Sequence, residues 1–260
     1  MHHLLKSTLA VFRANLGEIR SNFEFLALAA RIRPRMGRVL RWEGLKDEEK
    51  RVAQDFMKHS DIELGSIHRG LIVTIAGAFE EFVGSLVHAR IRVIDESESE
   101  YSRLDRMIAD RNIRYTGMAL ATIAQPIDYL GLDFVQLCKN IGSCHTGSSA
   151  FRLNGMAFRL NVGNLNSKRL TEVFARVGYQ PDWNYIGASA SLKKLMDKKR
   201  TRDCTKEVKN YLDQFVRIRN QAAHSASGGL TLEARDVEFA LSFFDECGSL
   251  LAEGVDSAAS

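Results

Sequence analysis

The stretch from residue 61 to residue 95 constrains the fold more than any other part of this sequence. It reads DIELGSIHRGLIVTIAGAFEEFVGSLVHARIRVID, without proline, and its apolar positions surround much of a helical cylinder. A helix that is apolar on most sides has to be buried inside the molecule. The sequence therefore predicts a central helix here, with other elements packed around it.

Three glycines mark one face of this predicted helix. Gly70, Gly77 and Gly84 recur at seven-residue spacing, and each costs about 1 kcal/mol relative to alanine inside a helix. Their repetition predicts that another helix approaches closely along this stripe. That helix belongs either to the same chain or to a second protomer, and we expect a packing seam within the chain.

The remaining sequence also favours helices. With three prolines in 260 residues, long uninterrupted helices are possible. Apolar residues recur at three- and four-residue spacing over the first 30 residues, and Pro34 is expected to end that helix. Further amphipathic helices are expected at 45–60, 164–179, 205–224 and 231–254. No strand pairing and no repeat are visible, so we predict an all-α fold in a single domain, 1–260.

Local signals suggest where these helices begin and end. Asn166 or Ser167 can cap one helix, and Gly178 stands where a left-handed terminating residue is wanted. The PDWN sequence at 181–184 is expected to form a turn, and Thr231 to cap the last helix.

Residues 96–160 are a possible insertion of short helices and loops, and residues 255–260 should fray. Within the insertion Cys138, Cys144 and His145 resemble part of a metal site, but no fourth ligand stands at a familiar spacing. We therefore expect no metal and no cofactor.

The four cysteines form no CxxC pair, which is typical of a reducing, cytoplasmic compartment. The longest apolar run, from Gly70 to Phe79, is about half of what a bilayer requires, and the N-terminus lacks a signal-peptide pattern. A cytoplasmic protein without a membrane span is expected.

Positive charge is clustered at 31–41 and 193–219, although the net charge is only +4. Charge alone leaves nucleic-acid binding and a solvated helix face equally open.

The stretch VRIRNQAAHSASGG, residues 216–229, carries the residue types best suited to catalysis. On a regular helix Asn220 lies about 40° and Arg217 about 20° from His224. Arg219 is about 140° away unless the helix unwinds near the histidine. An imidazole can take the proton of a ribose 2′-hydroxyl, and a guanidinium can stabilise charge on phosphoryl oxygens. The alternative is a structural helix end, where cations meet carbonyl groups and the helix dipole.

The six residues RNQAAH, 219–224, resemble the Arg-x4-6-His motif of the HEPN superfamily, in which a polar residue typically follows the arginine. GAFEEFVGSLV at 77–87 and NVGNLNSKRLTEVFARVGY at 161–179 are similar to the RiboL-PSP-HEPN group. This resemblance covers about residues 60–95 and 160–252.

The resemblance implies a helical bundle that dimerises through the motif helix and cleaves RNA without a metal ion. Many such proteins are toxins or antiviral, abortive-infection effectors, which leave a 2′,3′-cyclic phosphate. By this likeness His224 acts as general base or acid, Arg219 stabilises the transition state and Asn220 positions them. The expected partners are RNA, a second copy of the chain, and an antitoxin or defence protein.

From charge alone we add four candidate RNA-backbone contacts: Arg202, Lys206, Lys209 and Arg217. Two alternatives remain open at this stage. One is a non-catalytic HEPN scaffold that binds RNA or a protein. The other is a helical interaction protein in which RNQAAH occurs by accident.

Overall fold

The computed structural model describes residues 1–59, 64–123, 132–145, 151–224 and 231–258, and every element within these ranges is helical. The predicted all-α class is confirmed. The elements are α1 (His3–Val39), α2 (Asp47–His59), α3 (Leu64–Ser97), η1 (Tyr101–Arg103), α4 (Arg106–Ile123), α5 (Phe134–Ser143), η2 (Gly155–Arg159), α6 (Ser167–Ala175), α7 (Trp183–Ala188), α8 (Ala190–Leu195), α9 (Thr201–His224) and α10 (Ala234–Ser257).

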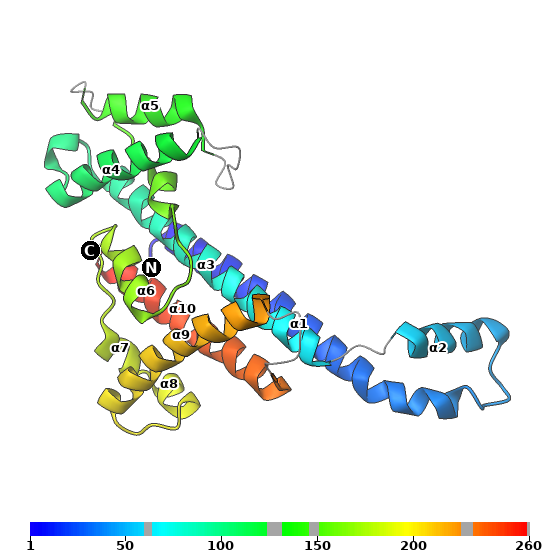
Figure 1. Cartoon of the computed structure of the whole chain (residues 1–260). Helices are drawn as coiled ribbons and strands as arrows, with labels where there is room; N and C mark the ends of the chain where they lie inside the picture. The colour runs from blue at the N-terminus through cyan, green and yellow to red at the C-terminus, as the bar shows by residue number, and fades with distance from the viewer. Residues whose placement is uncertain (60–63, 124–131, 146–150, 225–230, 259–260) are drawn as a thin grey trace.

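Helix α3 is the central element, as its sequence predicts. It packs against α1, α9, α10 and η2, and it runs from the arm formed by α1 and α2 to the lobe formed by α4 and α5 (Figure 1). Aromatic rings join the layers: Phe12 of α1 stacks on Phe82 with 4.2 Å between ring centroids, and Phe79 lies 4.6 Å from Phe244 of α10. By length and composition α3 could also cross a membrane, but half of its most apolar window is buried inside the protein. Packing accounts for that burial.

The expected packing seam within the chain is wrong for the glycines of α3, whereas the alternative of a second protomer stays a prediction. A side-chain carbon added at Gly70 or Gly77 would meet nothing within 4 Å, so these residues face open space. At Gly84 the added carbon would meet the side chain of Arg159 at 3.2 Å, rather than another long helix. The helices that cover α3 approach its large apolar side chains instead.

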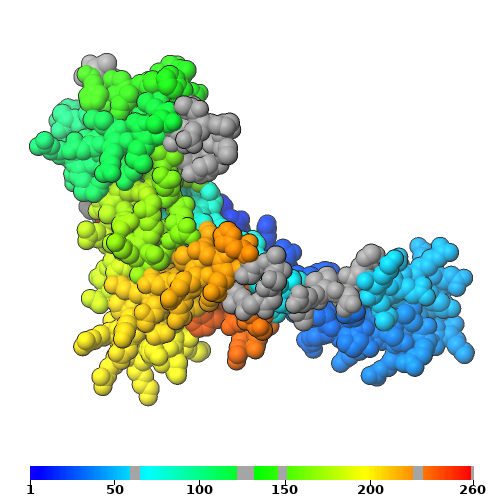
Figure 2. Space-filling view, viewed as in Figure 1, coloured from blue at the N-terminus to red at the C-terminus, as the bar shows by residue number. Residues whose placement is uncertain are grey.

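Helix α1 does not end at Pro34. The proline lies inside a 37-residue helix that continues to Val39. Proline removes one backbone hydrogen bond, but this half of the helix is largely exposed, where water can satisfy the freed carbonyl. Together with α2, the continued helix forms an arm that extends away from the rest of the molecule (Figures 1 and 2).

The helix-end predictions had mixed outcomes. Asn166 caps α6 by accepting a hydrogen bond from the backbone of Arg169, and Gly178 has φ +75°, as expected. PDWN is not only a turn, because Asp182 accepts from two backbone amides and starts α7. Glu233, rather than Thr231, caps α10, and it forms a capping box with the carboxylate of Asp236.

The C-terminal segment is also more ordered than the sequence suggests. Helix α10 continues to Ser257, because Val255 is fully buried and Asp256 accepts a hydrogen bond from the backbone of His2 at 2.6 Å. The predicted fraying of 255–257 is therefore wrong. Residues 259–260 lie outside the described residues.

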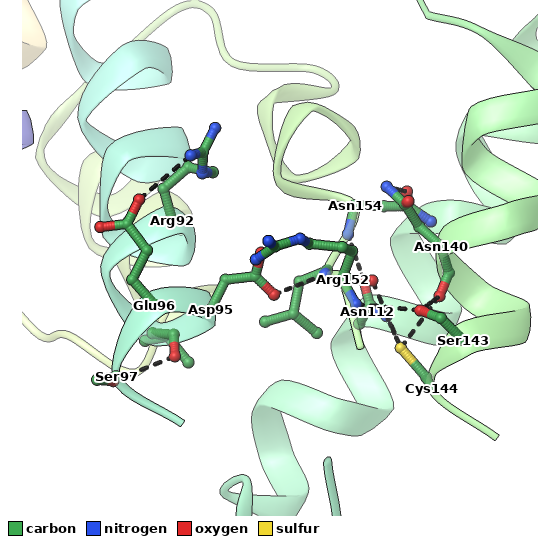
Figure 3. Close-up of polar contacts among 12 residues, drawn as sticks. Arg92, Asp95, Glu96, Ser97, Asn112, Asn140, Ser143, Cys144, Arg152 and Asn154 are labelled. Atoms are coloured by element: carbon green, nitrogen blue, oxygen red, sulfur yellow. Dashed lines mark hydrogen bonds and ion pairs between the residues drawn. The ribbon is translucent and has the colours of Figure 1, made fainter. Parts of the chain in front are cut away.

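The possible insertion at 96–160 contains η1, α4, α5 and η2, and it forms a lobe at the C-terminal end of α3 (Figure 1). A buried polar network holds it (Figure 3). The amide of Asn154 donates to Thr116 and to the carbonyl of Leu137, and it accepts from Asn140. Because these polar groups are buried and paired, they fix one arrangement of the lobe.

We expect opposite effects from two glycine substitutions in the core helices. Gly248→Ala places a carbon 2.6 Å from the ring of Phe12, and this overpacking should lower the free energy of unfolding by about 1–3 kcal/mol. Gly77→Ala meets nothing and should raise it by up to about 1 kcal/mol through helix propensity. Urea denaturation measures both. Equal effects would contradict this account of the glycines.

Candidate functional site

Helix α9 carries the RNQAAH sequence, and a stripe of buried apolar side chains holds this helix against the core. Val208, Leu212 and Phe215 are at most 4% exposed, so the predicted buried stripe is confirmed. Helix α9 packs against α3 and α7, and the ring of Phe215 lies 4.6 Å from that of Phe244 in α10. The helix remains regular to His224. Unwinding before the histidine, which would have brought Arg219 toward it, is therefore not seen.

Arg219 points toward α3, where it forms an ion pair with Glu80. One guanidinium nitrogen lies 2.7 Å and 2.9 Å from the two carboxylate oxygens. The side chains are only 23% and 20% exposed. Such a partly buried, charge-assisted contact is stronger than an exposed one and restricts the arginine to one orientation.

Two asparagines complete the arrangement around Arg219. The second terminal nitrogen donates to the side-chain oxygen of Asn220 at 2.9 Å and, more weakly, to that of Asn164 at 3.4 Å. The backbone N–H of Asn164 donates to Glu80 at 2.7 Å. Glu80 thus receives donors from both the arginine and the loop before α6.

The loop contact depends on an unusual backbone conformation. Asn164 has φ +50°, in the left-handed region, which asparagine tolerates better than most residues. The next residue, Leu165, is buried in the core and anchors the loop. Leu165, Phe215 and Phe244 line a small cavity that Glu80 and Arg219 also border. These apolar neighbours exclude water on one side and strengthen the ion pair.

His224 and Arg217 lie elsewhere on the helix. His224 is the last residue of α9 and is exposed, as is Arg217. Since the helix is regular, Arg217 is about 20° from His224 around the axis, whereas Arg219 is about 140° away. A single chain therefore brings Arg219 together with Asn220 and Glu80, but it does not place Arg219 beside His224.

The other candidate RNA contacts share the side of α9 that carries His224. Arg202 and Lys206 are exposed, while Lys209 lies 5.1 Å above the ring of Trp183 in a cation–π contact. Lys206 is about 27 Å from His224 along the axis, and Arg217 about 10 Å. The four cations share this side with two exposed acids, Asp203 and Asp213, which lie about 60° and 20° from His224 around the axis. The face is therefore mixed in charge, with cations in excess.

Sequence reasoning missed Glu80 and Asn164. A signal existed for Glu80, because Glu80 and Glu81 interrupt the most apolar helix, where carboxylates need partners. Glu81 is paired with Arg159 at 2.6 Å. Which acid faces α9 depends on how the helices are rotated against each other, and the sequence alone does not give that.

The cysteine and histidine residues that resembled part of a metal site in the sequence make other contacts in the structure. Cys144 is buried against Asn112 and Asn140, and burial raises the pKa of its thiol. His145 contacts the ring of Tyr101. Within the described ranges, no three His, Cys, Asp or Glu side chains gather where they could hold a metal ion.

A cavity of about 400 Å³ lies away from the motif, between α3, α5 and the segment before η2. Its lining includes Arg92 and Arg152 as well as Asp95 and Asp133, so its formal charges cancel. Asp95 is committed to the fold, because it accepts from the backbone of Leu153 and pairs with Arg152 (Figure 3). The motif helix does not line this cavity.

A comparison with known families decides the class of protein. The family model described as RiboL-PSP-HEPN matches residues 43–254. The chain belongs to this family. The predicted HEPN assignment is therefore confirmed, and so is the HEPN type of helical fold.

The HEPN match also spans residues 96–160, for which the sequence segments showed no likeness, and it begins after α1. No curated protein and no solved structure matched this chain. HEPN domains are generally associated with nucleases.

We expect the Glu80–Arg219 pair to be energetically coupled. Either Glu80→Gln or Arg219→Gln should lower the free energy of unfolding by about 1–3 kcal/mol, because the remaining, partly buried charge is left without its opposite charge. The double variant should cost less than the sum of the two. Urea denaturation of all four proteins measures the coupling.

Arg217→Gln serves as the matched control, since this arginine is exposed on the same helix. It should change stability by no more than about 0.5 kcal/mol. Additive losses for Glu80 and Arg219 would contradict the proposed coupling.

Proposed function

We propose that this chain is a metal-independent endoribonuclease of the HEPN type that acts as a toxin or antiviral effector. The observation that carries the proposal is the full RNQAAH motif at the end of α9, in a chain of the RiboL-PSP-HEPN family. His224 is exposed at the helix end, and Arg202, Lys206, Lys209 and Arg217 outnumber Asp203 and Asp213 on its side of α9. This surface suits an RNA backbone.

The proposed reaction needs only side chains. One His224 imidazole takes the proton of the ribose 2′-hydroxyl, and the freed oxygen attacks the adjacent phosphorus. The P–O5′ bond breaks as a protonated imidazole supplies a proton to the leaving oxygen. The products are a 2′,3′-cyclic phosphate and a 5′-hydroxyl. Guanidinium hydrogen bonds stabilise the added negative charge of the transition state.

The geometry of α9 supports a site shared by two copies. Arg219 and His224 are about 140° apart on one regular helix, so a single chain does not direct both at one phosphate. Two copies joined near their motif ends would place the Arg219 of one near the histidine of the other. Glu80 and Asn220 would then orient this arginine. We therefore propose a homodimer as the active form.

Arg217 is the competing arginine in this proposal. It shares the side of His224 and is exposed, whereas Arg219 already binds Glu80. If one chain suffices for cleavage, Arg217 is the better placed cation. The family motif favours Arg219.

A second candidate function is a non-catalytic HEPN scaffold that binds RNA or a protein partner. The ion pair between Arg219 and Glu80 favours the scaffold, because an arginine held by a carboxylate has fewer donors for a phosphate. With the family assigned, the reading of RNQAAH as an accident loses its support. Cleavage distinguishes the two remaining functions.

We expect the purified chain to cut total cellular RNA in EDTA and to leave cyclic phosphate ends. His224→Ala should reduce the cleavage rate by about 10²–10⁴-fold, since general acid–base catalysis contributes that much. Arg219→Ala should reduce it comparably, and Arg217→Ala less. Gel analysis with end-group chemistry measures both rate and product.

His3→Ala is the control, because His3 is exposed on another helix. It should cut RNA like the parent. A requirement for divalent metal, or full activity of His224→Ala, would contradict the proposed chemistry. RNA that is bound but stays intact with the parent chain would support the scaffold.

A further inference from the structure

The cavity between α3, α5 and the segment before η2 has the size of a small-molecule site. Its volume is about 400 Å³, and pockets for small ligands typically have about 300–1,000 Å³. Leu137, Leu153 and Met156 belong to the apolar part of its lining. In Figure 3 Arg92 of α3 lies on one side of Arg152, and Asn140 of α5 lies on the other. The cavity thus has two polar walls, one on α3 and one on α5.

The α3 wall presents hydrogen-bond donors in a positive field. His88 and Arg92 lie one helical turn apart and both line the cavity. Arg92 contacts Glu96 through one nitrogen, at 3.2 Å, which leaves most of its guanidinium donors for a ligand. The imidazole of His88 packs on Gly155, where a side-chain carbon would lie 2.7 Å from the ring. Burial, together with the positive charges of Arg159 and Arg92, lowers the pKa of His88. The ring is therefore neutral near pH 7 and keeps one N–H donor.

The carboxylate of Asp95 lies on the same wall, but the fold already uses it. Its side chain is 3% exposed, and it accepts from the backbone of Leu153 at 3.0 Å and from Arg152 at 3.3 Å. The side chain of Arg152 is 61% exposed and has further donors. On this side of the cavity a ligand therefore meets donors rather than acceptors.

The α5 wall presents acceptors, because a directed chain of hydrogen bonds ends there. The amide nitrogen of Asn154 donates to the carbonyl of Leu137, and its oxygen accepts from Asn140. The oxygen of Asn140 accepts from Gln136 at 2.6 Å, which leaves the amide oxygen of Gln136 for a ligand. Asp133 is exposed and caps α5 with one carboxylate oxygen, so its second oxygen is also open to a ligand.

We propose that this cavity binds a small zwitterion, with its carboxylate toward Arg92 and His88 and its ammonium group toward Asp133 and Gln136. The two walls then meet opposite charges, and a ligand without net charge matches a lining whose formal charges cancel. The apolar side chains cover the hydrocarbon part. Free amino acids and dipeptides with apolar side chains have this chemistry. The inference goes beyond the proposed function and does not depend on it.

Other ligands use less of the cavity. A polyanion such as an RNA phosphate chain is repelled by Asp95 and Asp133, and a metal cation is repelled by Arg92 and Arg152. An organic acid without an ammonium group leaves the acceptors on α5 without a donor. A zwitterion pairs with both walls.

Isothermal titration calorimetry of the full chain tests the proposal. Leucine and leucyl-leucine are each titrated in three forms: unmodified, N-acetylated and therefore without the ammonium group, and amidated and therefore without the carboxylate. An unmodified probe should bind at least about tenfold more tightly than its two blocked forms, because each lost charge removes charge-assisted hydrogen bonds. The probe that binds distinguishes an amino acid from a dipeptide. Equal affinity for the N-acetylated form, or no binding of either zwitterion at millimolar concentration, would overturn the proposal.

Two substitutions assign the ligand's charges to the two walls. Arg92→Gln should weaken the unmodified probe about tenfold but leave the amidated probe unaffected, since that probe has no carboxylate to lose. Asp133→Asn should weaken the unmodified probe but not the N-acetylated one. Asparagine also caps helices, so α5 is preserved.

Arg103→Gln is the matched control, because Arg103 is exposed in the same lobe, pairs with Glu100 and does not line the cavity. It should bind every probe like the parent. Thermal unfolding checks that each variant is folded, and the bound zwitterion should raise the Tm of the parent. If Arg92→Gln and Arg103→Gln have the same affinity for the zwitterion, the ligand does not bind in this cavity and the proposal fails.

Discussion

The burial of α3 is the constraint on which the rest of this structure depends. A helix with apolar side chains on most of its circumference requires cover from several directions, and α1, α9, α10 and η2 supply it. Any polar group on such a helix must find a partner, because an unpaired charge is costly beside a core. Glu80 forms an ion pair with Arg219, and Glu81 forms one with Arg159. The packing around α3 therefore also fixes the position of the motif arginine.

This coupling has a consequence for chemistry. Arg219 is held by a carboxylate and oriented by two asparagines, whereas His224 is exposed at the end of the same helix. Arg219 is thus held by contacts within the chain, whereas His224 is open to solvent. Such a division suits a site completed by a second molecule, because the fixed group sets the geometry and the exposed group can reach across. The same ion pair leaves the arginine fewer donors for a phosphate, and this observation supports the non-catalytic scaffold.

The fold was largely predictable from local patterns, and its exceptions share a cause. The periodicity of α3, the buried stripe of α9, the Asn166 cap and the turn at Gly178 depend on residues close in sequence. The glycine seam within the chain, the end of α1 at Pro34 and the frayed tail were wrong, because each depends on whether the tertiary structure covers or exposes that segment. Gly70 and Gly77 face no helix, Pro34 lies in an exposed arm, and Asp256 binds the first turn of α1.

The sequence by itself determined the family and the residues proposed for catalysis, since RNQAAH and its place before the last helix are properties of the order of amino acids. Only the tertiary structure decided how those residues are arranged. It turned Arg219 toward Glu80, brought Asn164 across from another loop, and left His224 and Arg217 on a separate side. The reason is that helix rotation is set by the packing of all neighbours at once. No local spacing encodes which of two adjacent glutamates faces which helix.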